Sequence, residues 1–279
     1  MNIINESDGS VLHIREFDAR RKLASAINVV IFGQRRVGKT TLLCDLVRYR
    51  KSDDHVYISN EDEDYSHNPI ITNIVPKMSI HTSFDDQIIS NITHVQRRRH
   101  KSNIFRHVSV MLDDCLYDKD TWTDKFRQLF CNSRCFRCSL FITAQYPFSI
   151  PAGLQQSVDY IFISRLPKEE RFYQLYGDMF PGFDTFLSVY DKIIKAGYWM
   201  VIDNRTCYRI KKLEDRIFYY KIDHPLHRAV TTISRQWRSI LNKRRLIRLK
   251  IGNELLHYPK VGIKYFEALQ HFNHNQKAF

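Results

Sequence analysis

The chain has 279 residues, of which 43% are hydrophobic and 26% charged, proportions that exclude a low-complexity or collagen-like protein and favour a folded one. Lys and Arg (43) exceed Asp and Glu (30), and the net charge of +13 favours a polyanionic partner, either nucleic acid or an anionic membrane surface. No apolar run approaches the ~20 residues of a membrane span, and the polar N-terminus lacks a signal-peptide pattern, so we expect an intracellular protein without a transmembrane segment.

Apolar runs and helical patterns alternate along residues 28–165. Short runs rich in β-branched and aromatic residues predict strands at 28–32, 55–59, 107–115, 138–145 and 159–165. Leucine and other apolar residues at helical spacing predict helices at 39–50, 83–101 and 121–134. Such alternation predicts an α/β fold, with an open, mainly parallel sheet that carries helices on both faces.

The helix expected at 83–101 ends in the sequence "RRRHK". Ser83 is placed to cap its N-terminus, and the cations suit the negative end of the helix dipole. Contact with DNA is an equally good explanation of the same cations.

The pattern changes after residue 166. Two more helices are expected on either side of Pro181 and Gly182, followed by two late strands near 197–206 and 216–222. From residue 224 the chain is strongly basic, and the segment 233–250 contains no acidic residue and reads as a basic amphipathic helix. We therefore expect a domain at 1–223 and a basic, mainly helical extension at 224–279.

A phosphate-binding loop follows the first buried strand. The motif G-x-x-x-x-G-K-[ST] is matched in full, and the residues expected to hold a nucleotide are Gly33, Gln34, Arg35, Arg36, Val37, Gly38, Lys39, Thr40 and Thr41. Lys39 should reach the β- and γ-phosphates, and Thr40 should ligate Mg²⁺. A preceding strand and a following helix form the context that makes this motif specific.

Polar side chains follow two later strands. Asp113 and Asp114 close the run "VSVMLDDC", where Asp113 is a candidate Mg²⁺ ligand and Asp114 is placed to orient or deprotonate the attacking water. Gln145 closes "FITAQ" and is placed either to sense a γ-phosphate or simply to end the strand. These residues predict ATP and Mg²⁺ as ligands and water as the acceptor.

The P-loop, "LDDC" and "FITAQ" together resemble the FtsK/HerA superfamily of DNA-pumping ATPases. Within it, the chain is similar to the poxvirus-type DNA-packaging ATPases of nucleocytoplasmic large DNA viruses, over roughly residues 11–221. The resemblance implies a P-loop NTPase of the additional-strand, RecA-like kind. It also implies Lys39, Asp114 and Gln145 as catalytic residues, with Thr40 and Asp113 at the metal.

The same resemblance implies an arginine finger. Arg134 stands where relatives have the arginine of Asn-Gly-Arg-His, but Ser133 and Cys135 replace the flanking Gly and His. Gln155 also stands where relatives often have an arginine, which leaves Arg134, Arg165 or neither for this role.

The function that the resemblance implies is ATP-driven translocation of double-stranded DNA into a viral capsid by a homo-oligomeric ring. Capsid or inner-membrane viral proteins are further candidate partners, and the expected location is the host cytoplasm at the assembly site, or the virion. The alternatives are a cellular FtsK/HerA-like translocase or a conjugation-type pump. A signalling GTPase is disfavoured because "NKRR" at 242–245 lacks the aspartate of a guanine-reading motif.

Overall fold

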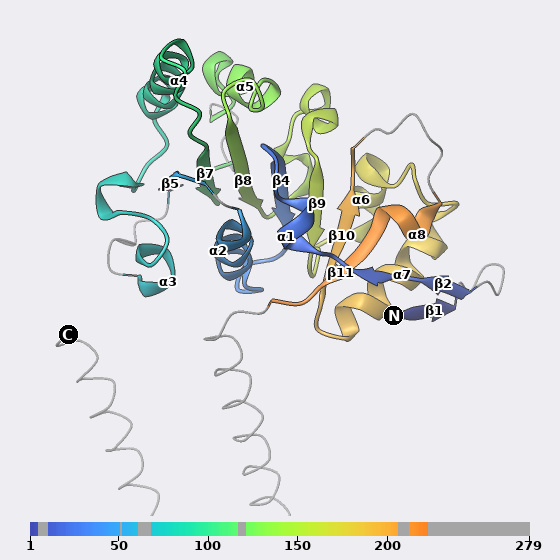
Figure 1. The fold of residues 1–279 in the computed structure, drawn as a ribbon. Coiled ribbons are helices and arrows are strands. Elements are labelled where there is room, and N and C mark those ends of the chain that lie inside the picture. The colour runs from blue at the N-terminus through green and yellow to red at the C-terminus, as the bar shows by residue number, and fades with distance from the viewer. Residues whose placement is uncertain (5–10, 51, 61–67, 117–120, 206–211, 223–279) are drawn as a thin grey trace, which may run out of the picture. The chain divides into compact units, whose positions relative to one another are not determined.

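The computed structural model describes residues 1–4, 11–50, 52–60, 68–116, 121–205 and 212–222 (Figure 1). The chain divides into two units, Met1–Ile222 and Asp223–Phe279. The second unit lies outside the described residues, and so does the basic helix expected within 224–279.

The centre of the first unit is a mixed sheet. Among the described residues it has nine strands in the order β3-β11-β10-β9-β4-β8-β7-β5-β6. The strands are β3 (Arg15–Glu16), β4 (Asn28–Phe32), β5 (Asp54–Ser59), β6 (Ile80–His81), β7 (Val108–Asp113), β8 (Cys138–Ala144), β9 (Tyr160–Ile163), β10 (Trp199–Asp203) and β11 (Ile217–Tyr220). Neighbouring strands are parallel except where β10 pairs with β9 and β11. The predicted open, mainly parallel sheet is confirmed.

The strand order places an additional strand beside the P-loop strand. β4 has β8 and β9 as its neighbours, so β8 lies between β4 and the aspartate-bearing β7. The carboxyl ends of these parallel strands meet at one edge of the sheet, which we call the carboxyl edge. The edge where they begin is the amino edge.

Helices cover both faces of the sheet. They are α1 (Ala19–Lys22), α2 (Lys39–Tyr49), α3 (Pro69–Thr72), α4 (Asp86–Lys101), α5 (Asp124–Cys131), α6 (Glu169–Tyr176), α7 (Phe183–Lys195) and α8 (Leu213–Arg216). Within the described ranges, 3₁₀ turns lie at Lys77–Ser79, Pro147–Ser149 and Ala152–Ser157, and β1 (Asn2–Ile4) pairs antiparallel with β2 (Val11–His13).

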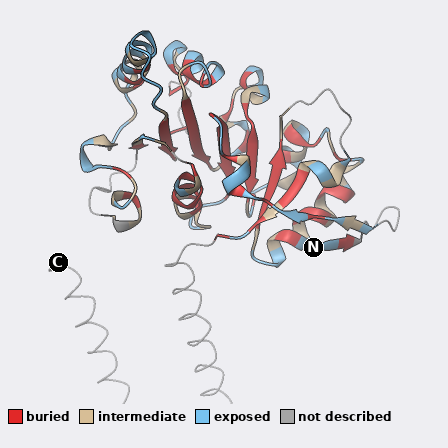
Figure 2. Cartoon of the chain, viewed as in Figure 1, coloured by how far each residue is buried: buried red, intermediate tan, exposed pale blue. Residues whose placement is uncertain are grey.

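Two apolar cores explain this layering, because side chains on a strand point to alternate faces. Along β4, Val30 and Phe32 enter the core shared with α4, α5, α6 and α7. Val29 and Ile31 enter the core shared with α1, α2 and α3. Burial on both faces is the reason that the central strands are continuous apolar runs, and Figure 2 shows these strands buried along their length.

The start of α4 differs from the expectation. The helix begins at Asp86, three residues after Ser83, and its N-cap is Asp85, whose side chain accepts a hydrogen bond from the Gln87 amide at 2.7 Å. A carboxylate at the N-cap also complements the positive end of the helix dipole, which a serine hydroxyl does not.

Candidate functional site: a nucleotide site at the carboxyl edge

The P-loop adopts a backbone that only particular residues allow. Gly38 has φ +91°, a conformation that L side chains rarely adopt. A Cβ on Gly33 would lie 2.8 Å from Val37 Cγ2, so a side chain there would displace the loop. Arg36 is also left-handed, with φ 63°. Left-handed residues of this kind turn backbone N–H groups into an anion-binding concavity at the start of α2, so the loop fits a phosphate chain.

Lys39 is held over this loop. Its side chain is 7% exposed, and Nζ donates to the carbonyl oxygens of Gly33 and Gln34, both at 3.2 Å. The ammonium also lies 3.8 Å from Asp114 Oδ2. The ammonium therefore lies between the P-loop and the paired aspartates.

Asp113 receives three hydroxyl groups. Thr40 Oγ1 and Tyr57 OH donate to Oδ2 at 2.5 and 2.8 Å, and Thr143 Oγ1 donates to Oδ1 at 2.5 Å. Burial raises the pKa of the Asp113 carboxyl, and hydrogen bonds from Thr143, Thr40 and Tyr57 oppose the rise. The Thr40 hydroxyl and the Asp113 carboxylate thus lie side by side. Mg²⁺ prefers oxygen ligands of these kinds, so the two residues fit that ion.

The Asp114 side chain has different hydrogen-bond partners from the Asp113 side chain. Its φ of 53° is left-handed, which aspartate tolerates better than most residues and which is typical of functional sites. Its amide donates to Thr143 Oγ1 at 2.8 Å, and its Oδ2 accepts from Gln145 Nε2 at 2.9 Å. The turn at Asp114 therefore directs the two adjacent carboxylates apart. The Asp113 carboxylate binds hydroxyl groups, and the Asp114 carboxylate faces Lys39 and Gln145.

The structure brings most of the predicted residues together. The P-loop follows β4, Asp113 ends β7, and Gln145 follows β8, so all three lie at the carboxyl edge. Arg35 and Arg36 are exposed at the loop apex. The exposed Arg165 lies at the same edge after β9, where its carbonyl oxygen accepts from the Gln34 amide at 2.9 Å.

Arg134 lies apart from them, at the amino edge. It precedes β8 and forms an ion pair with Asp159, a buried carboxylate that precedes β9 and also accepts from the Asn28 amide at 2.9 Å. Strands of five to seven residues separate the two edges by roughly 20 Å. Arg134 therefore does not reach the P-loop of its own subunit.

Two hydroxyl residues of this site were missed in the sequence. Tyr57 lies in β5 and Thr143 in β8, the strands on either side of β7. In the sequence both look like ordinary strand residues. The one feature that could have indicated a site is a hydroxyl group within an otherwise apolar run. Their role depends on strand order, because each hydroxyl reaches the Asp113 carboxylate only when its strand lies next to β7.

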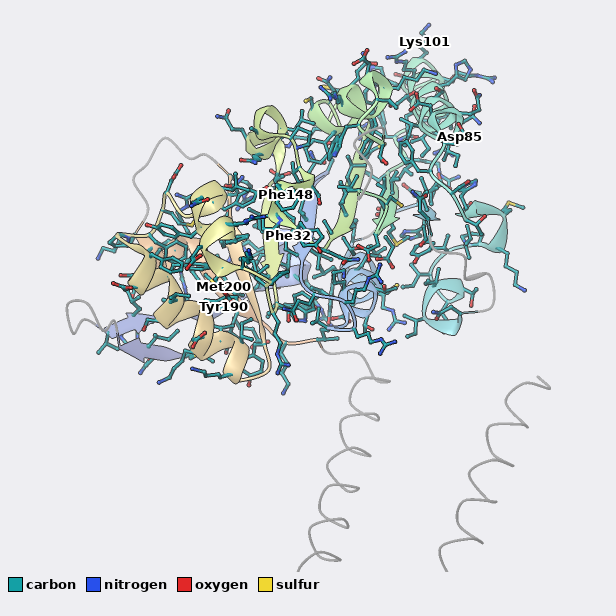
Figure 3. All side chains as sticks on the ribbon, turned by 180° about the vertical axis from the view of Figure 1, so that it is seen from behind. Phe32, Asp85, Lys101, Phe148, Tyr190 and Met200 are labelled. Atoms are coloured by element: carbon teal, nitrogen blue, oxygen red, sulfur yellow. The ribbon has the colours of Figure 1, made fainter. Side chains whose placement is uncertain are left out.

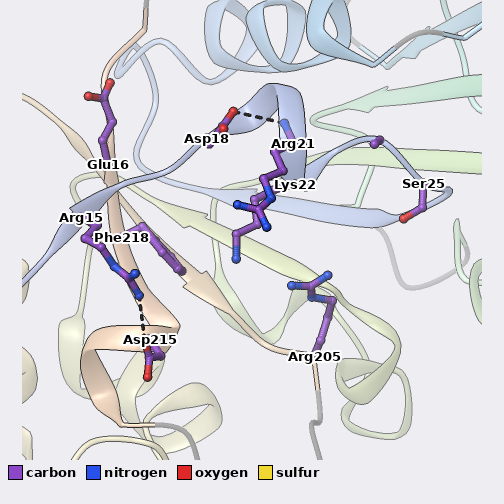
Figure 4. Close-up of a pocket in the computed structure, with 10 residues that line it drawn as sticks. Arg15, Glu16, Asp18, Arg21, Lys22, Ser25, Arg205, Asp215 and Phe218 are labelled. Carbon is purple, nitrogen blue, oxygen red and sulfur yellow. Dashed lines mark hydrogen bonds and ion pairs between the residues drawn. The ribbon is translucent and has the colours of Figure 1, made fainter.

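A basic pocket of about 620 Å³ lies elsewhere, against α1, β3 and β11 (Figure 4). Most of its cations are already paired with carboxylates: Arg15 with Asp215 at 2.7 Å, and Arg205 with Asp203 at 2.7 Å. Lys22 lies 3.6 Å from the same Asp203. This pocket is therefore largely neutralised from within the chain.

Comparison with known proteins gives distant relatives. No family model matches the chain. The uncharacterized protein 075L of Invertebrate iridescent virus 6 is 25% identical over 234 residues, which cover 77% of this chain and 88% of that protein. In the part of the chain that the structure describes, no helix is long and apolar enough to cross a membrane.

Two solved structures are also similar. The genome packaging NTPase B204 from Sulfolobus turreted icosahedral virus 2, in complex with ATP-gammaS, has a TM-score of 0.49 and 13% identity, covering 70% of this chain and 97% of that one. The cytoplasmic domain of the Type VII secretion ATPase EccC from Thermomonospora curvata has a TM-score of 0.47 and 11% identity, covering 80% of this chain and 28% of that one. The chain's own strand order, with the P-loop after β4 and the aspartate pair after β7, is that of a P-loop NTPase.

Proposed function

We propose that this chain is an ATPase of the FtsK/HerA superfamily that translocates double-stranded DNA to package a viral genome. One observation carries the proposal: the P-loop, Asp113, Asp114 and Gln145 converge at the carboxyl edge, although they come from three separate strands. A paired-aspartate site with an adjacent glutamine suits water as the acceptor of a phosphoryl group, whereas a kinase would need a second substrate. The 25% identical protein of an iridescent virus supports the viral setting.

The P-loop residues Gly33–Thr41 are proposed to hold the triphosphate of ATP. Their backbone N–H groups would face the phosphates, and Lys39 would give up its contacts with loop carbonyls to bind phosphate oxygens. Thr40 and Asp113 would hold Mg²⁺, which neutralises charge on the phosphate oxygens when bound.

Asp114 is proposed as the base and Gln145 as the residue that holds it in place. The 2.9 Å hydrogen bond between them fixes Asp114 Oδ2 beside Lys39. Asp114 would accept a proton from a water that attacks the γ-phosphorus, while the bond from that phosphorus to the β-phosphate oxygen breaks, leaving ADP and phosphate. Gln145 could then report loss of the γ-phosphate to β8.

Arg134 is proposed to act in trans. Its position at the amino edge rules out a role at its own P-loop, but its side chain is 68% exposed and accessible to a neighbouring subunit. A homo-oligomeric ring in which Arg134 completes the next site would explain why the arginine lies so far from the other residues. An arginine supplied in this way is worth roughly 10³-fold or more in rate.

The alternative within this proposal is Arg165. It is exposed at the carboxyl edge, beside Gln34, and would act within its own subunit. Loss of hydrolysis on Arg165→Ala but not on Arg134→Ala would select it.

The test is ATP hydrolysis by the full chain with and without double-stranded DNA. We expect DNA to stimulate hydrolysis, and Lys39→Ala to abolish both nucleotide binding and turnover. Lys192→Ala, on the exposed surface of α7, is the matched control and should leave both unchanged. Absence of hydrolysis by the wild type in every oligomeric state, with DNA present, would refute the proposal.

A further inference from the structure

Two segments without acidic residues meet at the amino edge. Residues 87–112 and 125–158 contain no Asp or Glu, although the chain as a whole has 30. The first segment includes most of α4 and the loop after it, and the second includes the turn between α5 and β8. Gln96 joins them, since its Nε2 donates to the carbonyl oxygens of Arg106 and Phe136 at 3.0 and 2.8 Å.

This junction carries a group of cations, which we call the α4 basic surface. Its members are Arg97, Arg98, Lys101 and Arg137. Arg98 and Lys101 are exposed on the last turn of α4, and neither has a carboxylate partner among the described residues. Figure 3 labels Lys101 at the end of α4 opposite Asp85, among nitrogen-tipped side chains.

Nearby carboxylates do not neutralise this surface. Asp54 is bound to two other arginines, Arg99 at 2.6 Å and Arg106 at 3.1 Å. Asp53 accepts from the His107 amide at 2.7 Å. In the pocket of Figure 4, by contrast, most cations are paired with carboxylates, so the α4 basic surface retains more of its charge.

Aromatic rings orient two of the arginines. The guanidinium of Arg137 lies 4.4 Å from the centroid of the exposed Phe105 ring, and that of Arg97 lies 5.3 Å from the centroid of Phe136. A stacked guanidinium keeps its N–H groups at the ring edge free for other acceptors, and it loses less side-chain entropy on binding. Such arginines are suited to phosphate oxygens.

The helix dipole alone does not account for the arrangement. Cations in the last turn of a helix are stabilised by the negative end of the helix dipole, and α7 shows the ordinary case. Its last-turn Lys195 is bound at 2.7 Å to Asp191, one turn earlier. On α4 the last-turn cations are more numerous, two of them lack such a partner, and Arg137 joins them from a separate segment.

We infer that the α4 basic surface binds the backbone phosphates of duplex DNA. This inference rests on the proposed function and names the part of the chain that grips the translocated polymer. The surface has unpaired or ring-stacked cations and exposed aromatic area, as phosphate contacts require, and no arrangement of amide and carboxylate groups for reading bases. Arg134 borders the surface but is excluded, because Asp159 already neutralises it.

The surface is joined to the nucleotide site through α2. Arg50, which follows this helix, lies with Nη2 2.9 Å from His107 Nδ1 and donates from Nη1 to the Ala24 carbonyl oxygen at 2.8 Å. His107 follows the loop that carries Phe105 and Arg106. DNA bound at the surface thus acts on a loop in contact with the helix that begins at the P-loop.

The experiment compares the full chain with its Arg98→Ala/Lys101→Ala variant. The dissociation constant for a duplex of random sequence is measured from 0.05 to 0.5 M salt, together with DNA-stimulated ATP hydrolysis. Two lost phosphate contacts should reduce the log–log salt slope by about 1.8 and the affinity at 0.15 M salt roughly 30-fold. The control Lys192→Ala/Lys195→Ala removes two last-turn cations from α7 and should change neither quantity.

Three outcomes overturn the inference, and they are distinguishable. If the wild type binds duplex DNA and the α4 variant has the same salt slope, this surface is not the DNA-binding site, and the proposed function is unaffected. No salt-dependent duplex binding by the wild type removes the DNA part of the proposed function as well. Preferential α4-dependent binding to phosphatidylserine vesicles reassigns the surface to a membrane. Recovery of the slope in Arg98→Lys/Lys101→Arg supports charge recognition and excludes loss of folding.

Discussion

Asp114 combines a left-handed backbone with a side chain that faces Lys39 and Gln145. Asn tolerates the same backbone and nearly the same shape, so Asp114→Asn should fold while losing the ability to accept a proton. We expect kcat for ATP hydrolysis to fall by roughly 10²–10⁴-fold, since this is the usual contribution of a general base.

Nucleotide affinity separates this role from a structural one. A fluorescent ATP analogue should bind Asp114→Asn with nearly the affinity of the wild type, because the P-loop backbone and Lys39, and not Asp114, are proposed to contact the phosphates. The 3.8 Å contact between Lys39 and Asp114 is not one of these phosphate contacts. Asp178→Asn, at an exposed position after α6, serves as the control for loss of one negative charge. A large loss of nucleotide binding in Asp114→Asn would contradict the assignment of this residue to chemistry.

Arg134 has a partner within its own subunit, and this partner predicts a pH-dependent effect. Burial raises the pKa of the Asp159 carboxyl, while Asn28 and Arg134 oppose the rise. Arg134→Ala should raise that pKa further and destabilise the fold by roughly 1–2 kcal/mol, less than for a fully buried pair because Arg134 is largely exposed.

The sign of the pH effect follows from the raised pKa. Above the folded-state pKa the Asp159 charge is buried without its cation, so the full destabilisation is present near pH 8. It shrinks as pH falls through the folded-state pKa of the variant, and it vanishes once Asp159 is protonated in the folded state of both proteins, because the unfolded chains titrate alike and cancel. Thermal unfolding of Arg134→Ala and the wild type between pH 4 and 8 measures this difference.

A second substitution separates stability from action in trans. Arg134→Ala/Asp159→Asn replaces the buried charge by an amide that still accepts from the Asn28 amide, so it should unfold near the wild-type temperature. If Arg134 completes a neighbouring site, hydrolysis by the assembled protein should remain low in this double variant. Full recovery of activity along with stability would leave Arg134 as a structural residue only.

At the scale of elements, α2 is anchored far from its P-loop end. Tyr220 on β11 donates from its hydroxyl to Asp45 Oδ2 at 2.7 Å, in the middle of the helix. Both groups are buried. Tyr220→Phe should lower the free energy of unfolding by about 1–3 kcal/mol, since a buried carboxylate loses a donor, and denaturant unfolding measures it.

The matching variant is Asp45→Asn/Tyr220→Phe. A buried amide without the hydroxyl donor costs less free energy than a buried carboxylate without it, so the double variant should recover part of the stability. If Tyr220→Phe were as stable as the wild type, the hydroxyl would not be needed to hold α2 against the sheet.

The central elements are the part of the fold that the sequence predicts best. β4 matches its predicted bounds, and β7 and β8 differ from theirs by one or two residues at the ends. Burial on both faces makes each of them a continuous apolar run, which local pattern detects directly. The P-loop and the aspartates were found for the same reason, because they directly follow such runs.

Contacts between elements were not predictable from local pattern. The antiparallel direction of β10 depends on how α7 returns the chain to the sheet, and nothing within Trp199–Asp203 encodes it. Tyr57, Thr143 and the Arg134–Asp159 pair acquire their partners only through strand order. The cap of α4 was misplaced because Ser83 and Asp85 are both good caps, and packing decides between them.

At the scale of the whole molecule, the charge is divided between the described unit and the segment 224–279. The residues of the P-loop, the aspartate pair and both apolar cores all lie within Met1–Ile222. A chain that ends at Ile222 should therefore fold and bind nucleotide with the affinity of the full chain. Circular dichroism and titration with the fluorescent ATP analogue measure both properties.

The truncated chain should still lose DNA affinity, because the deleted segment is strongly basic. If that segment and the α4 basic surface contact separate phosphates, their contributions to the salt slope are independent and should add. Combining the truncation with Arg98→Ala/Lys101→Ala should then lower the slope by the sum of the two separate decreases. If the combined decrease in salt slope is no larger than that of the truncation alone, the basic segment makes all of the phosphate contacts, and the α4 cations contribute only to helix stability.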